Sequence, residues 1–105
     1  MVKILTYCFD LDLTLCLTSG LDYNRAVPIQ ERINVVNELY RLGHEIKIYT
    51  ARGTETGISW EEVTKNQLKL WRLKYHGVYF GKPSADFYID DKGVKDSDFF
   101  RDLLH

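Results

Sequence analysis

In the stretch YCFDLDLTLCLT, residues 7–18, an apolar run ends in two aspartates that stand one residue apart. From Ile4 to Phe9 the chain is apolar at every position except Thr6, which is typical of a strand buried on both faces. Such strands occur in parallel sheets whose connections are helices. The stretch therefore predicts the first strand of an α/β protein, with Asp10 at its carboxyl end.

The rest of the chain alternates between helical and strand-like patterns. Apolar residues between Ile29 and Tyr40 recur at helical spacing, whereas HEIKIYT alternates as a strand does. In order, the patterns predict a helix over residues 28–43 with Pro28 at its first position, a strand over 44–50, a helix from a Ser59 cap to about Tyr75, a strand that ends at Gly81, a strand over 86–91 and a helix capped by Ser97. We expect one domain over residues 1–105, a three-layer Rossmann-like α/β fold with strand order about 3-2-1-4.

Composition and charge argue against several classes of protein. The 105 residues carry a formal net charge of -1 without a block of like charge, so we expect no binding to nucleic acid or to an anionic membrane. No apolar segment is long enough to cross a bilayer, and ILTYCF lacks the pattern of a secretory signal. Cys8 and Cys16 form no CxxC motif, which disfavours a disulfide framework or a zinc site. A reducing, cytoplasmic setting is expected.

Polar residues stand where the predicted strands end. The first strand ends at Asp10, the second at Thr50, the third just before Lys82, and the fourth at Asp90 and Asp91. Because these ends share one edge of a parallel sheet, the carboxylates would repel one another without a cation. Mg²⁺ takes oxygen ligands and typically binds one or two carboxylates together with a substrate phosphate. The edge therefore predicts a Mg²⁺ site that acts on a phosphoryl group.

Each of these residues also has an ordinary structural explanation. The segment DLDLTLCLT could be a half-buried strand, and Thr50 could satisfy a loop backbone group. Lys82 could be a solvated turn residue, Arg52 a surface loop residue, and the paired aspartates the start of the turn DDKG. Trp60 and Trp71 are expected in the core. The functional interpretation depends on the coincidence of polar residues at all four predicted strand ends.

Taken in order, these residues resemble the motifs of the haloacid dehalogenase (HAD) superfamily of phosphohydrolases. FDLDLT resembles the first motif, IYT the second, the lysine of GKP the third and YIDD the fourth, over Ile4 to about Gly93. The resemblance implies a HAD-like fold and a Mg²⁺-dependent phosphatase that works through an aspartyl-phosphate. Leu13–Val27 offers at most a small flap and Ala51–Ser59 a loop, so we expect no cap domain.

The resemblance also implies roles for the matching residues. Asp10 is the nucleophile, and Asp12 protonates the leaving oxygen and then deprotonates the attacking water. Thr50 hydrogen-bonds the phosphoryl group and Lys82 neutralises charge. Crowding by like charge would help Asp12 to hold a proton near neutral pH. The residues expected to contact the phosphate are Leu11, Thr50, Ala51, Arg52 and Lys82.

The metal ligands follow from the same resemblance. Mg²⁺ would be held by Asp10, by the carbonyl of Asp12 and by an acid of the fourth motif, for which register favours Asp91 over Asp90. The further acid of that motif is not cleanly matched, since Lys95 stands four positions beyond Asp91, and Asp96 one further. Thr14 matches the threonine that stabilises the loop after the nucleophile.

An open site without a cap implies either a bulky substrate or a lid that a neighbouring subunit supplies. A homo-oligomer is therefore one of the two alternatives. The tract from Gly57 to Gly93 resembles small capless members found with bacterial surface-polysaccharide genes, which favours a small phosphorylated substrate such as a sugar phosphate. A phosphotransferase or phosphomutase would use the same residues. A receiver domain or an inert phosphate-binding domain are further alternatives, although the order of the motifs opposes a receiver.

Overall fold

The computed structural model describes residues 3–20, 22–53, 59–81, 85–90 and 94–104. At its centre is a five-stranded sheet in the order β5-β4-β1-β6-β7, in which every neighbouring pair is parallel. The strands are β1 (Thr6–Asp10), β4 (Glu45–Tyr49), β5 (Gly77–Tyr79), β6 (Phe87–Asp90) and β7 (Val94–Lys95). The predicted α/β class is thereby confirmed, and β7 is a strand that the sequence patterns did not predict.

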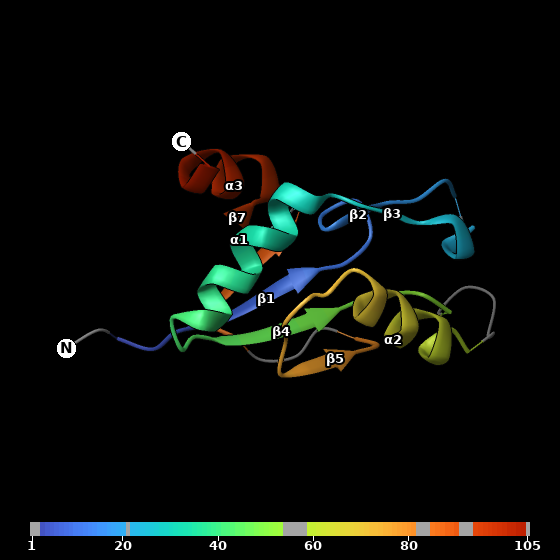
Figure 1. Ribbon diagram of the computed structural model, residues 1–105, viewed down its shortest axis with the longest axis horizontal. Coiled ribbons are helices and arrows are strands. Elements are labelled where there is room, and N and C mark those ends of the chain that lie inside the picture. The colour runs from blue at the N-terminus through green and yellow to red at the C-terminus, as the bar shows by residue number, and fades with distance from the viewer. Residues whose placement is uncertain (1–2, 21, 54–58, 82–84, 91–93, 105) are drawn as a thin grey trace.

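The helices follow the expected alternation with the strands (Figure 1). They are α1 (Gln30–Arg41), α2 (Glu61–Leu70) and α3 (Asp96–Leu104). Between β1 and α1, a two-stranded antiparallel hairpin of β2 (Cys16–Leu17) and β3 (Val27–Pro28) encloses the short 3-10 helix η1 (Tyr23–Arg25). This hairpin with η1 is the small flap that the sequence predicted, and it lies beyond the carboxyl end of β1. Within the described residues, no helix is long and apolar enough to span a membrane.

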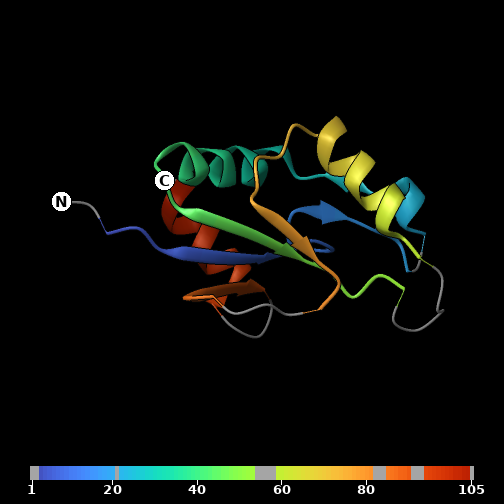
Figure 2. The same ribbon diagram turned by 90° about the horizontal axis from the view of Figure 1, so that it is seen from below.

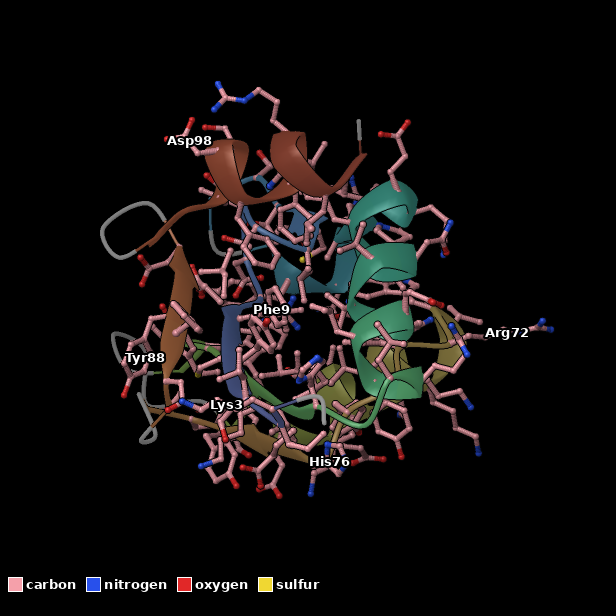
Figure 3. The ribbon with its side chains drawn as sticks, turned by 90° about the vertical axis from the view of Figure 1, so that its left-hand side faces the viewer. Lys3, Phe9, Arg72, His76, Tyr88 and Asp98 are labelled. Carbon is pink, nitrogen blue, oxygen red and sulfur yellow. The ribbon has the colours of Figure 1, made fainter. Side chains whose placement is uncertain are left out.

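The three-layer arrangement is wrong for the described residues, because α1, α2 and α3 all cover the same face of the sheet (Figures 2 and 3). The crossovers through α1 and α2 both step in one direction, from β1 to β4 to β5, so right-handed connections place both helices on one face. The return to β6 uses residues 80–86, which leave no room for a helix of ordinary length. Tyr88 in β6 points away from the helices, whereas Phe9 lies between the sheet and the helices (Figure 3).

One buried cluster joins the sheet to the helices. It takes alternate residues of the strands, because successive side chains of a strand point to opposite faces. The cluster contains Phe9, Ile46, Ile48 and Ile89 from the strands, Ile33 and Val36 from α1, Leu68 and Trp71 from α2 and its end, and Phe100 from α3.

Three predicted helix starts differ from the structure. Pro28 lies in β3 opposite Cys16, and α1 begins at Gln30. A short edge strand accommodates Pro28, because proline has no N–H to donate. Ser59 does not cap α2, because Trp60 occupies the N-cap position and makes no side-chain cap hydrogen bond. Ser97 lies in the first turn of α3, which begins at Asp96.

The end of α2 and the two tryptophans differ in part from expectation. The helix ends at Leu70 rather than near Tyr75, since Arg72 adopts a positive φ of 58° that stops it. Trp71 is buried in the core as predicted, whereas Trp60 is half-buried and packs edge-on against Tyr23 of the flap.

The core description predicts unequal effects for two leucines of α2. Leu68 is fully buried and Leu70 is 77% exposed. Replacing Leu68 by Ala should lower the free energy of unfolding by about 2–5 kcal/mol, since it removes packed side-chain atoms and leaves a cavity. The matched change Leu70→Ala should alter it by no more than about 0.5 kcal/mol. Urea denaturation followed by circular dichroism measures both, and equal losses would contradict this core.

Candidate active site

The carboxyl ends of β4, β1 and β6 bring four of the sequence-predicted residues to one edge of the sheet. Asp10 ends β1 and pairs in register with Tyr49, the residue before Thr50, while Asp90 ends β6 on the other side of β1. Asp12 follows β1 by two residues and turns back to contact Thr50. Lys82 and Asp91, the other predicted members, lie outside the described residues.

A tight loop after β1 determines where Asp12 lies. The carbonyl of Leu11 accepts hydrogen bonds from the N–H groups of Leu15 and Cys16, at 2.9 and 3.2 Å. Leu13 takes a positive φ of 68°, which reverses the chain direction at a non-glycine residue. Thr14, expected to stabilise this loop, is buried, and its carbonyl accepts a hydrogen bond from Arg32.

The Asp12 carboxylate is held from two sides. The Thr50 hydroxyl donates to Oδ2 at 2.9 Å. The Arg52 guanidinium donates from Nη2 to Oδ1 at 2.8 Å and from Nε to both oxygens, at 3.0 and 3.1 Å. The Arg52 side chain is fully buried in this ion pair, while Asp12 keeps 19% of its side chain exposed. The surface-loop interpretation of Arg52 is therefore wrong, and a cation lies against Asp12 where the sequence suggested crowding by like charge.

The structure describes three further residues that were expected to contact the phosphate, Leu11, Ala51 and Thr50. Leu11 has a buried side chain, and its N–H donates to the carbonyl of Tyr49 at 3.0 Å. Ala51 is exposed beside Thr50. Since the Thr50 hydroxyl donates to Asp12 and accepts from the N–H of Arg52 at 3.2 Å, it would have to turn from Asp12 to donate to a phosphoryl group.

Asp90 is buried and has a partner that the sequence analysis missed. The Tyr49 hydroxyl donates to Oδ2 of Asp90 in a short hydrogen bond. Burial, together with this bond and the nearby Asp10 carboxylate, raises the pKa of the Tyr49 phenol above its ordinary value, so the phenol keeps its proton. The alternation of residues along β4 could have indicated this contact, because it places Tyr49 on the same face as Asp10.

Asp96 is a second residue whose position the sequence left unresolved. Together with Asp10, Asp12, Leu13 and Thr14 it lines a cavity of about 120 Å³ beside the end of β1. Its carboxylate accepts a hydrogen bond from Nη1 of Arg32 in α1, at 2.8 Å. The resemblance predicted an acid three or four residues beyond Asp91, whereas Asp96 stands five residues beyond it, directly after the two residues of β7.

The donor set at this edge fits a hard cation. Its side-chain donors include carboxylate oxygens of Asp10 and Asp90, and Asp91, which was also predicted here, lies outside the described residues. Within the part of the chain that the structure describes, no three His, Cys, Asp or Glu side chains form a preassembled metal cluster. Mg²⁺ needs no such cluster, because it keeps several waters and often takes only one or two protein carboxylates.

Cys16 borders the Asp12 ion pair and is chemically shielded. Burial, reinforced by the Asp12 carboxylate and opposed by Arg52, raises the pKa of its thiol to about 12. The nucleophilic thiolate is therefore scarce at neutral pH. In a Cys8→Ala background, we expect Cys16 to react with a dithionitrobenzoate reagent at about pH 8 at least 100-fold more slowly in the native protein than in urea. Equal rates would contradict the buried position of Cys16.

The comparisons with known proteins identify relatives of known structure. No family model matches the chain, and no curated protein matches it. A conserved protein from Bacteroides thetaiotaomicron is 17% identical, with a TM-score of 0.65 over 97% of this chain and 91% of that one, and it shows the fold alone. A structural-genomics target from Vibrio cholerae is 30% identical, with a TM-score of 0.74 over 92% of this chain and 88% of that one. The chain belongs to the same family as the Vibrio cholerae protein.

Proposed function

We propose that the protein is a Mg²⁺-dependent phosphatase that hydrolyses a phosphate monoester through an aspartyl-phosphate on Asp10. The observation that carries this proposal is the pair Asp10 and Asp12, which line one small cavity at the edge of the sheet in different surroundings. Asp10 stands beside the Tyr49 and Asp90 pair, whereas Asp12 is held by Thr50 and Arg52. The resemblance of the ordered motifs to HAD phosphohydrolases supports the same assignment.

The proposed reaction has two steps. An oxygen of the Asp10 carboxylate attacks phosphorus, the bond from phosphorus to the ester oxygen breaks, and Asp12 gives its proton to the leaving oxygen. Asp12 then takes a proton from water, whose oxygen attacks the same phosphorus and frees Asp10 and inorganic phosphate. Because Asp12 lines the cavity beside Asp10, one carboxylate can serve both proton transfers.

The metal would be held by Asp10, by the backbone carbonyl of Asp12 and by Asp91, with Asp90 as the alternative. The bond from Tyr49 already occupies one oxygen of Asp90, which supports the choice of Asp91. When bound, Mg²⁺ would neutralise charge on the phosphoryl oxygens. Lys82 would contribute a further positive charge.

A sugar phosphate or a similar small metabolite is the favoured substrate. The cavity of about 120 Å³ has room for a phosphoryl group, so the rest of the substrate would lie outside it, beside Leu13. Leu13 lines the cavity and is 63% exposed, which gives that part of the substrate an apolar contact. Cys8 and Cys16 are both buried and neither forms a disulfide, which supports a reducing, cytoplasmic setting.

Release of phosphate tests the proposed reaction. Against a panel of sugar phosphates, nucleotides and 4-nitrophenyl phosphate, wild type should release phosphate with Mg²⁺ and lose that activity with EDTA. Asp10→Asn should lower kcat by roughly 10⁴-fold or more without unfolding the chain, because the amide is a poor nucleophile. The control Asp98→Asn changes an exposed carboxylate of α3 and should keep wild-type activity. Full activity of Asp10→Asn would refute the assignment.

A second variant separates the role of Asp12 from that of Asp10. Asp12→Asn should slow both the release of the leaving group and the release of phosphate, by about 10²- to 10⁴-fold, since it removes the proton donor and acceptor. Rapid-quench measurement of each product resolves the two steps. If the variant turned over 4-nitrophenyl phosphate at the wild-type rate through the whole cycle, Asp12 would not be the acid and base.

A further inference from the structure

Arg52 makes more contacts than its ion pair with Asp12 requires. Its Nη1 donates to the Thr64 hydroxyl at 3.1 Å and to Oε1 of Gln67 at 2.6 Å, both in α2. Its Nη2 also approaches the sulfur of Cys16 at 3.8 Å, besides donating to Asp12. A guanidinium has five N–H groups. With Nε on Asp12, each of the five has an acceptor, so Arg52 would have to give up one of these bonds to bind a substrate.

The same network reaches the flap. The Arg52 guanidinium lies over the ring of Tyr23 in η1, 4.8 Å from its centroid. Gln67, which accepts from Arg52, also donates from Nε2 to the Tyr23 carbonyl at 2.6 Å. Arg52 therefore contacts α2, the flap and the loop that carries Asp12.

Stability alone is a weak reason for such a buried ion pair. Taking two charges out of water costs free energy that their attraction often fails to offset, and well-packed apolar residues can be equally stable in the same place. A planar, fully bonded guanidinium does fix the plane and position of the carboxylate that it grips. The network is better explained by the geometry that it imposes on Asp12 than by stabilisation of the fold.

We infer that Arg52 is a positioning residue, which fixes the Asp12 carboxylate relative to the flap so that the leaving oxygen of the substrate meets Asp12. This inference rests on the proposed function, because it assigns a purpose to the orientation of the proposed acid. Arg52 acts through Asp12 and through Tyr23, and the phosphate contact expected of it from the sequence is not part of this role. The role predicts a dependence on the leaving group.

The test compares a phosphate ester that needs protonation on leaving with one that does not. Glycerol 1-phosphate has a poor leaving group, and 4-nitrophenyl phosphate has a good one. Arg52→Lys keeps the charge but loses the planar fork, so it should slow release of glycerol by about 10²-fold and release of nitrophenol by less than about 10-fold in a single turnover. Asp12→Asn should show the same imbalance more strongly.

Milder variants keep the inference testable if Arg52→Lys does not fold. Thr64→Val removes one acceptor from Nη1, and Gln67→Met removes another together with the bond to the Tyr23 carbonyl, while both variants keep Arg52 and Asp12 themselves. Each should slow glycerol release about 3- to 10-fold more than nitrophenol release, because the guanidinium is held less firmly. The control Asn66→Leu, at an exposed position of α2, should change neither rate.

The outcomes separate the inference from the proposed function. Equal losses on both esters, or wild-type rates in every folded variant, would show that Arg52 serves the fold alone and would overturn the inference, with the phosphatase assignment intact. If wild type hydrolysed neither these esters nor any member of the phosphate panel, the proposed function would fail, and the inference with it.

Discussion

β1 pairs in parallel with β4 on one side and with β6 on the other, and this pairing positions the whole candidate site. Parallel strands end at a common edge, so Asp10, Thr50 and Asp90 meet there although they are far apart in sequence. The register of the strand pairing positions the site as much as the order of the strands does. A slip of one residue would move Phe9 out of the core and turn Asp10 toward the helices, and burial of the apolar set prevents that slip.

The arrangement gives the two aspartates of the first motif different surroundings. Strand alternation turns Asp10 away from the core, to the face that it shares with Tyr49 and Asp90. Asp12 lies past the strand, where the tight loop turns it toward Thr50 and Arg52. Two carboxylates in different surroundings can divide nucleophilic and proton-transfer work between them.

The sequence predicted the features that depend on local pattern. The apolar run to Phe9 and the alternation of HEIKIYT led to the central strands, and the polar strand ends led to Asp10, Thr50 and Asp90. The sequence did not predict contacts between segments that are distant along the chain. The sequence around Arg52 is typical of a loop, and its contacts with α2 and the flap are visible only in the structure. Likewise, Asp96 lines the cavity at the start of α3, directly after β7, a strand that the sequence did not predict. Pro28 was misplaced because a helix start and an edge strand both tolerate a missing N–H.

The proposed reaction depends on phosphorylation of Asp10 during turnover. The most direct measurement is the intact mass of protein quenched with acid during steady-state turnover with Mg²⁺ and a good substrate, followed by peptide mapping. A fraction of the chains should carry one added phosphoryl group, located on Asp10 and missing from Asp10→Asn. Phosphate release from chains that never gain this mass, even in Asp12→Asn, where the second step is slowed, would contradict an aspartyl-phosphate on Asp10, as would a phosphoryl group on another residue.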